Sequence, residues 1–249
     1  MFERKEGKGH RVYIIDLLVT KIFMRIKKNR DVDLELERIP EYEVLEYLRS
    51  NGLSVPSTYF KTNKIMIQNY IENTKFDEIK DIDEYFMKKS NMLRAIHRLD
   101  IGSLNGYSEY KNSKQFYYYL VKSLLDFYKR YDKVLIENNI RRDEIEILWG
   151  KCDLISERNL TLCHGDVQES NFMFHKENIS VIDWEHALIG DPYYDLSLLY
   201  CRASYPEDQK NKIICDYFGE TEIPLLELGL YIEIERLRKE CVKIVRKNI

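Results

Sequence analysis

Short apolar runs of the kind found in β-strands mark the first part of the chain. Residues 11–15 and 17–24 are predicted to form two strands, and residues 64–68 the second half of a hairpin. Before that hairpin, apolar residues recur at helical spacing from Pro40, which suits a first helical turn, to the stop at Gly52. The pattern therefore predicts several strands and one helix in this part.

Helical periodicity dominates the rest of the chain. The clearest predicted helix covers residues 114–138, and the segments 92–99 and 225–249 carry similar apolar stripes. Two strand-like runs, residues 171–174 and 179–182, flank a polar turn and are predicted to pair as a hairpin. We therefore expect a mainly helical second part that contains one β-hairpin.

Polar residues suited to phosphate transfer gather around this hairpin. Asp166 follows the apolar run 160–163, so we expect its carboxylate on a turn at the end of a strand, where it can face a substrate. Asn171 comes five residues later, and its amide oxygen is a ligand that suits Mg²⁺. The hairpin is expected to bring Asp183 back beside Asn171. Phosphoryl transfer needs a carboxylate near the attacking hydroxyl and oxygen ligands for magnesium, and this group offers both.

These residues belong to three ordered motifs. The chain contains H-G-D-x-x-x-x-N at 164–171, I-D-W-E at 182–185 and G-D-P-x-x-D-L at 190–196. Together they resemble the aminoglycoside phosphotransferase and choline kinase superfamily, which is related to the protein kinases. The resemblance implies an α+β, bilobal, protein-kinase-like fold. Residues 1–72 would form a small N-terminal antiparallel β lobe with the hinge, and residues 73–249 a larger, mostly α-helical C-terminal lobe.

The resemblance implies a role for each motif residue. Asp166 is expected to be the catalytic residue, which accepts or orients the hydroxyl proton of the acceptor. Asn171 and Asp183 are expected to hold Mg²⁺ on the phosphates. His164 is expected to anchor the loop through hydrogen bonds, and Asp195 to cap or brace it from the start of a helix.

The nucleotide, ATP or GTP, is expected to bind to the N-terminal lobe. Lys21 matches the strand lysine that reaches the phosphates in the family, and a solvent-exposed lysine on an edge strand is the alternative. Glu41 is expected to pair with Lys21 from the first helix, with Glu43 as the other candidate partner. The loop around Gly7 and Gly9 matches the one that covers the phosphates in the family.

Adenine is expected to bind at the junction of the two lobes. The residues that resemble this junction are Asn69, Tyr70 and Ile71. Their backbone groups, not their side chains, would make the hydrogen bonds. The assignment therefore depends on the resemblance alone.

Composition and charge narrow the possible partners. The chain of 249 residues has a formal charge of −3, with 39 Lys and Arg against 42 Asp and Glu, so nothing favours nucleic acid as a partner. The longest early apolar run, residues 12–19, is interrupted by Asp16 and predicts neither a signal peptide nor a membrane span. Five cysteines show no metal-binding spacing. We therefore expect a cytoplasmic protein with reduced thiols and no membrane partner, and its oligomeric state stays open.

The acceptor is expected to be a small molecule with a hydroxyl group. An aminoglycoside-type antibiotic and a choline-like amino alcohol are the two leading candidates. Many aminoglycoside phosphotransferases end in acidic residues that hold the cationic drug, whereas this tail is basic. Acidic groups that could hold an ammonium are Glu207, Asp208, Glu220, Glu222 and Glu227, and an aromatic cage for choline could come from Trp184, Tyr193 and Tyr194.

A catalytically inactive, kinase-like binding or structural protein of the spore-coat kind is the alternative. The few residues before Gly7 favour it slightly. The residues expected to do the chemistry argue against it, because all are present: Lys21, Asp166, Asn171 and Asp183. The sequence therefore favours an active small-molecule kinase.

Overall fold

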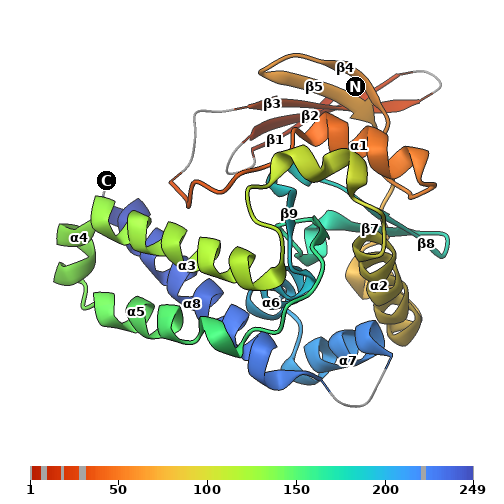
Figure 1. Ribbon diagram of the computed structural model, residues 1–249. Helices are drawn as coiled ribbons and strands as arrows, with labels where there is room; N and C mark the ends of the chain where they lie inside the picture. The colour runs from red at the N-terminus through yellow and green to blue at the C-terminus, as the bar shows by residue number, and fades with distance from the viewer. Residues whose placement is uncertain (1, 7–9, 18–19, 28–31, 220–222, 249) are drawn as a thin grey trace.

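The N-terminal part is an antiparallel sheet of five strands in the order β1-β2-β3-β5-β4 (Figure 1). The computed structural model describes residues 2–6, 10–17, 20–27, 32–219 and 223–248 of the chain. The strands are β1 (Phe2–Glu6), β2 (His10–Asp16), β3 (Lys21–Lys27), β4 (Thr58–Lys61) and β5 (Ile65–Asn69). Helix α1 (Glu41–Ser50) lies between this sheet and the rest of the molecule. The predicted hairpin and helix are thus confirmed.

Strand β3 lies further along the chain than the apolar pattern predicted. The backbone N–H of Leu17 donates to the carbonyl of Thr20 at 2.8 Å, which closes a turn between β2 and β3. The strand therefore starts at Lys21 and continues to Lys27 instead of ending at Met24. This shift makes Lys21 the first residue of the strand and places Arg25 inside it.

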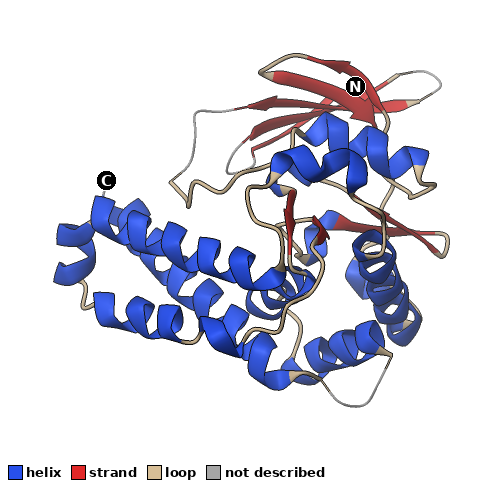
Figure 2. Ribbon diagram, viewed as in Figure 1, coloured by secondary structure: helices blue, strands red, loops and turns tan. Residues whose placement is uncertain are grey.

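The C-terminal part is mainly helical, as Figure 2 shows. Its helices are α2 (Ile82–His97), α3 (Ser113–Arg130), α4 (Asp132–Glu137), α5 (Arg142–Gly150), α6 (Pro192–Arg202), α7 (Glu207–Phe218) and α8 (Leu225–Asn248). Short 3₁₀ turns occur at Phe76–Glu78, Gly102–Tyr107, Cys152–Leu154, Glu169–Asn171 and Trp184–His186. No helix among the described residues is long and apolar enough to cross a membrane.

The helix predicted over residues 114–138 is two helices. Tyr131, with φ −121° and ψ 25°, leaves the helical conformation at the end of α3. Its N–H is shared between the carbonyls of Phe127 and Tyr128, so the chain turns before α4 begins. After this turn, Leu135 of α4 is fully buried.

Two small antiparallel ribbons join the sheet to the helices. Strand β6 (Thr161–Cys163) pairs with β9 (Leu188–Gly190), and β7 (Phe172–His175) pairs with β8 (Asn178–Val181). The second ribbon confirms the predicted hairpin. The motifs at 164–171 and 182–185 therefore lie on the connections that follow β6 and β8, and the motif at 190–196 runs from the end of β9 into α6 (Figure 1).

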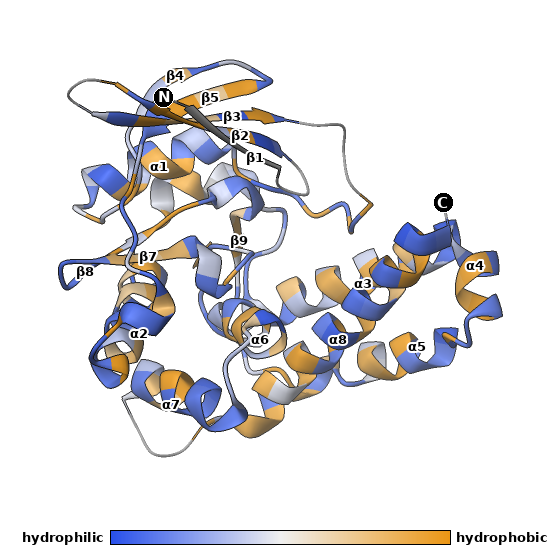
Figure 3. Cartoon of the chain, turned by 180° about the vertical axis from the view of Figure 1, so that it is seen from behind, coloured by the Kyte–Doolittle hydropathy of each residue, from blue (hydrophilic) through white to orange (hydrophobic). Residues whose placement is uncertain are grey.

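One apolar core runs through both parts of the molecule. It includes Leu45 and Leu48 of α1 together with Trp184, which is fully buried. The long helices carry apolar residues on part of their circumference and polar residues on the remainder (Figure 3). The tail, predicted as one or two helices, is the single helix α8, and its apolar stripe belongs to this core.

Candidate active site

Asp166 lies on the loop between β6 and β7, and 8% of its surface is exposed. Its Oδ2 accepts hydrogen bonds from Nε2 of Gln168 at 2.8 Å and from Nδ2 of Asn171 at 3.0 Å. Its Oδ1 forms an ion pair with Arg202 of α6. The carboxylate is therefore mostly buried, with both oxygens held by protein groups, and its catalytic role stays a prediction.

Asn171 presents its amide oxygen away from Asp166. Its Nδ2 donates both to Oδ2 of Asp166 and to the Asp166 carbonyl, the latter at 2.8 Å. Because both of these groups can only accept, the amide nitrogen must face them and Oδ1 must face the other way. That oxygen is the atom that a magnesium ion would use.

Asp183 follows strand β8 and lies close to Asn171. The N–H of Ile182 donates to the Asn171 carbonyl at 3.0 Å, which places the two segments side by side. Asp183 itself has a left-handed backbone conformation with φ 64°, and 34% of its side chain is exposed. The structure thus brings Asp166, Asn171 and Asp183 together, and the oxygen atoms of the last two fit a hard divalent cation.

Asp195 braces the catalytic loop from the first turn of α6. Its two carboxylate oxygens accept the backbone N–H groups of His164, at 2.7 Å, and Gly165, at 2.9 Å. His97 adds a contact from Nε2 at 3.1 Å. Burial acts to raise the pKa of Asp195, but these partners hold that pKa below its usual value. The predicted bracing role is confirmed, whereas the side chain that caps α6 is Asp191.

Gly165 leaves no room for a side chain. Its φ of +75° belongs to the left-handed region, and an added Cβ would collide with the carbonyl oxygen of His186. His164 is anchored at the same place, because its Nε2 lies 2.9 Å from the Ile182 carbonyl and its ring packs on Trp184. Burial lowers the pKa of His164, so this imidazole is a neutral anchor of the loop, as predicted.

The predicted ion pair between Lys21 and Glu41 is wrong. Glu41 instead pairs with Arg25, whose guanidinium also contacts Asp183. Lys21 is exposed, and its Nζ lies 5.8 Å from the centre of the Tyr70 ring. Arg25 is buried, and it is the residue of β3 that pairs with Glu41.

The two ion pairs of Arg25 explain why the sequence alone did not point to this residue. A buried cation needs anionic partners, and Arg25 has two, on α1 and after β8, both far from it in sequence. Burial raises the pKa of Glu41 to about 7, although Arg25 acts in the opposite direction. The available signal was a charged residue inside an apolar strand, which Arg25 fits better than Lys21 once the strand is placed correctly.

The predicted adenine-binding segment leaves one donor without a protein partner. The N–H of Asn69 donates to the Ser57 carbonyl at 3.1 Å, and that of Tyr70 to the Lys21 carbonyl at 3.2 Å. For Ile71, no hydrogen bond from the N–H is formed within the described part of the chain. The adenine contacts stay a prediction, with the Ile71 N–H as the donor that remains. Gly7 and Gly9 lie outside the described residues.

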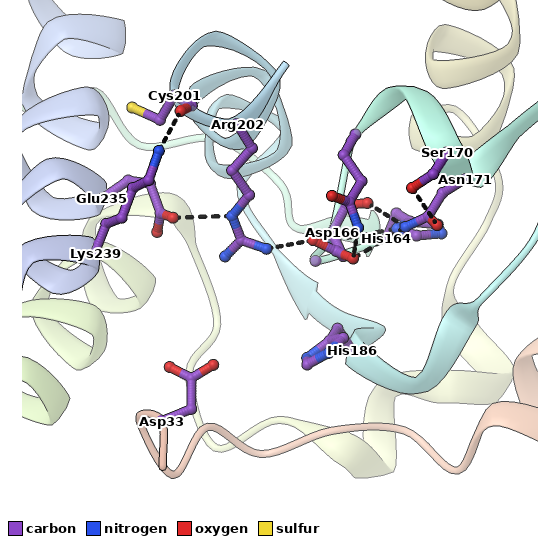
Figure 4. A network of polar contacts seen from close by, with 12 residues as sticks. Asp33, His164, Asp166, Ser170, Asn171, His186, Cys201, Arg202, Glu235 and Lys239 are labelled. Carbon is purple, nitrogen blue, oxygen red and sulfur yellow. Dashed lines mark hydrogen bonds and ion pairs between the residues drawn. The ribbon is translucent and has the colours of Figure 1, made fainter. Parts of the chain in front are cut away.

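Arg202 is a further residue beside Asp166 that the sequence did not point to. Its Nη1 pairs with Asp166 and its Nε donates to Glu235 of α8 at 3.0 Å (Figure 4). Arg238 binds the same Glu235 through two nitrogens, at 2.6 and 2.8 Å, and also pairs with Asp33. A chain of alternating charges therefore runs from the surface residue Asp33 to the catalytic loop.

Three of the groups suggested for holding a cationic acceptor are engaged elsewhere. Trp184 is buried against His164, and the ring face of Tyr193 is covered by the guanidinium of Arg158, 4.1 Å from its centre. Glu227 pairs with the same Arg158 at 2.6 Å. Glu220 and Glu222 lie outside the described residues. The predicted cage and the predicted acid Glu227 thus do not form an open site near Asp166.

Comparisons with known proteins agree with this fold. Protein LicA of Haemophilus influenzae is 21% identical over 187 residues, which are 73% of this chain and 67% of that protein. A second LicA sequence from Haemophilus influenzae is 19% identical over 219 residues, covering 86% of this chain and 62% of the relative. The chain thus spans about two thirds of the length of these curated relatives.

Solved structures show the same fold. Choline kinase LicA from Streptococcus pneumoniae has a TM-score of 0.70 at 17% identity, over 100% of this chain and 86% of that one. The streptomycin–ATP ternary complex of APH(2'')-IIa has a TM-score of 0.67 at 16% identity, over 99% of this chain and 90% of that one. The α+β, bilobal, kinase-like architecture is therefore confirmed.

A family model also matches most of the chain, including the motifs. The model of the phosphotransferase enzyme family covers residues 4–222, which include the catalytic loop, Asp183 and Asp195. The chain therefore belongs to the phosphotransferase enzyme family.

Proposed function

We propose that the chain transfers the γ-phosphate of ATP or GTP, with Mg²⁺, to a hydroxyl group of a small molecule. The observation that carries this proposal is that the Asp166 carboxylate is hydrogen-bonded by the Asn171 amide nitrogen, with the partly exposed carboxylate of Asp183 close by. The Asn171 amide oxygen has only a long contact, 3.4 Å from the Ser170 hydroxyl, among the described residues. Family membership supports it, as does the similarity in fold to choline kinase LicA and to the ATP complex of APH(2'')-IIa.

The acceptor hydroxyl would bind against the carboxylate of Asp166. Its oxygen attacks the γ-phosphorus, the bond from this phosphorus to the β,γ-bridging oxygen breaks, and the nucleoside diphosphate leaves with that electron pair. The hydroxyl proton passes to Asp166. Bound magnesium would supply positive charge to the phosphate oxygens, with Asn171 and Asp183 as its protein ligands.

The remaining residues of the site hold this arrangement in place. Asp195 fixes the backbone of the loop, so that the Asp166 carboxylate does not need to reorganise during the reaction. Arg25 ties Asp183 to Glu41 on α1, which couples the metal site to the nucleotide lobe. A catalytically inactive binding protein would have no need of such a braced carboxylate.

The test is phosphate transfer from labelled ATP and GTP, with Mg²⁺, to a panel of small alcohols. We expect Asp166→Ala to lower turnover by at least about a hundredfold, because the group that receives the proton is removed. Nucleotide binding and the unfolding transition should persist. Asp143→Ala, which removes an exposed acid on α5, is the matched control. Unchanged turnover in Asp166→Ala would refute the mechanism, and binding without transfer in the native protein would favour the inactive alternative.

A further inference from the structure

A charged cavity lies beside Asp166, where the acceptor of the proposed reaction would bind. It has one acidic residue among its lining side chains and three arginines. It encloses only about 10 Å³ of free space, too little for a substrate, so its side chains must move when an acceptor binds. The lining residues are Asp33, Leu34, Leu36, Arg38, Gly165, His186, Leu188, Tyr194, Arg202 and Arg238.

The carboxylates in and behind this cavity are already paired with guanidinium groups. Asp33 pairs with Arg238, and Asp166 pairs with Arg202. Glu235, behind the cavity wall, is bound by both arginines at 2.6 to 3.0 Å. Burial acts to raise the pKa of Glu235, but the two arginines hold it below the usual value, so the carboxylate stays ionised and committed to them. A cationic acceptor would therefore have to displace an arginine from its partner.

An aromatic cage for a quaternary ammonium is also missing from this wall. Tyr194 is the one phenolic or indole ring among the lining residues that the structure describes, and it is buried. Cation recognition by aromatic groups needs several ring faces around the charge. The cavity therefore offers a choline-like head group neither free acids nor a cage.

Two arginines, by contrast, have donors to spare. Arg202 uses Nη1 and Nε for its two acids, and no partner of its Nη2 occurs within the described part of the chain. Arg38 is exposed and forms no ion pair with any described residue, although its charge helps to hold the pKa of the nearby Asp33 carboxyl below its usual value. Guanidinium groups bind carboxylate and phosphate oxygens through paired N–H donors. The donors that remain in the cavity thus suit an anion.

We propose that the acceptor carries an acidic group, a carboxylate or a phosphate, which Arg202 and Arg38 bind, and this rests on the proposed function of the same site. Binding of the anion draws Arg202 away from Asp166. Oδ1 of Asp166 then becomes available to the hydroxyl of the same acceptor. Arg202 is in this way the residue that determines acceptor specificity.

The test compares alcohols that differ only by the acidic group. Matched pairs are L-serine with ethanolamine, D-glycerate with ethylene glycol, and glycerol 3-phosphate with glycerol. We expect kcat/KM to be at least about tenfold higher for the acidic member of one or more pairs, as a charge-assisted contact implies. The first two pairs report on carboxylate and the third on phosphate. Choline and ethanolamine as better acceptors than every acidic compound would overturn the inference while leaving the proposed function intact.

Variants of Arg202 locate the effect. Arg202→Gln should raise KM for the acidic acceptor about tenfold to a hundredfold and reduce the preference within the pair. Arg202→Lys keeps the positive charge. It should therefore retain part of the preference for the acidic acceptor, even if loss of the contact with Glu235 lowers the stability of the fold. Arg236→Gln removes an exposed arginine of α8, next to Glu235 in the chain, and should change neither quantity. A preference that survives in Arg202→Gln would refute the role of Arg202.

Measurements of acceptor binding test the inference even if no phosphate transfer is detected. Calorimetric titration of each pair, with Mg²⁺ and ADP present, should show tighter binding of the acidic member. Equal or absent binding of the acidic members would overturn the inference. A native protein that binds neither ATP nor GTP would instead overturn the proposed function, and this result does not depend on the comparison within any pair.

Discussion

Arg25 and Lys21 lie four residues apart on one strand and differ in burial and in their charged partners. Arg25 is buried between Glu41 and Asp183, whereas Lys21 is exposed near the Tyr70 ring. A guanidinium can bridge two carboxylates at once because its donors form a planar fork, which an ammonium lacks. The strand cation of this site is therefore an arginine.

Substitutions at the two positions should separate these roles. We expect Arg25→Met to weaken Mg²⁺-nucleotide binding and lower turnover at least about tenfold, because Glu41 and Asp183 lose their shared partner. Arg25→Lys should be milder. Lys21→Met is the matched control and should change turnover less than about twofold. Nucleotide titration by fluorescence or calorimetry measures the affinity of the Arg25 and Lys21 variants. A larger effect at Lys21 would show that Lys21, and not Arg25, is the strand cation of the site.

Lys89 of α2 is a buried cation without a carboxylate partner. It is 0% exposed, and its Nζ has no hydrogen-bond partner among the described residues. The ring centres of Phe172 and Tyr205 lie 4.3 and 5.1 Å away and offset part of the cost of burial. Burial lowers the pKa of Lys89 to about 7.

This lowered pKa has a defined effect on stability. The unfolded chain binds the proton more tightly than the folded one, so the free energy of unfolding should rise as pH increases from about 7 towards 10. Lys89→Met should stabilise the protein by about 1–3 kcal/mol at pH 7 and by less at pH 10. Urea unfolding at both pH values measures this, with Lys122→Met, at an exposed position of α3, as the control. An equal effect at both pH values would contradict the lowered pKa of the buried Lys89.

Among the elements, α6 has the most influence on the catalytic loop. Its first turn supplies Asp195 to the backbone of His164 and Gly165, and its last residue, Arg202, pairs with Asp166. One helix therefore controls both the shape of the loop and the access to its carboxylate.

Asp195→Asn should separate the effect of the loop's backbone shape from the effect of access to the Asp166 carboxylate. An amide has one acceptor oxygen where the carboxylate has two, so a loop N–H loses its partner in a buried place. We expect a loss of about 1–3 kcal/mol in unfolding free energy and a larger fall in kcat than in nucleotide affinity. Asp208→Asn, at an exposed position of α7, should be neutral in both assays. Normal kcat in Asp195→Asn would show that the loop keeps its shape without this brace.

The elements that could be predicted are those set by local sequence. The hairpin β7–β8, helix α1 and the three motifs each depend on neighbouring residues at fixed spacing, and each lies where it was expected. The position of β3 was not predicted, because the turn before it depends on a backbone hydrogen bond and not on an apolar pattern. The Arg238–Asp33 pair joins residues 205 positions apart, and no local signal reports such a contact.

At the scale of the whole molecule, the two lobes share their core. The N–H of Val181 donates to the Ser54 carbonyl at 3.1 Å, and that of Ile39 donates to the Ala187 carbonyl at 2.9 Å. Helix α1 packs on the turn Trp184–His186 that follows Asp183. Residues 32–57 are thus fastened to the helical part as well as to the sheet. The boundary predicted after residue 72 stays a prediction, and it would cross this shared core.

A fragment of residues 73–249 tests how far the larger lobe depends on the smaller one. Without α1 and the segment before it, the apolar surface around Trp184 and Val181 would be exposed to water. We expect the fragment to lack a cooperative urea transition and to bind a hydrophobic dye, while the full chain unfolds in one step. A cooperative, dye-free fragment would show that the C-terminal lobe is an independent domain.

The contact between Arg202 and Asp166 also affects the protein when no acceptor is bound. Both carboxylate oxygens of Asp166 are engaged, Oδ1 by Arg202 and Oδ2 by Gln168 and Asn171. A water molecule in the acceptor position carries no charge that could draw Arg202 away, so it meets no free proton acceptor. Under the proposed function, the protein without its acceptor is therefore expected to hold nucleotide with little hydrolysis, so that nucleotide consumption follows the supply of acceptor rather than the amount of protein.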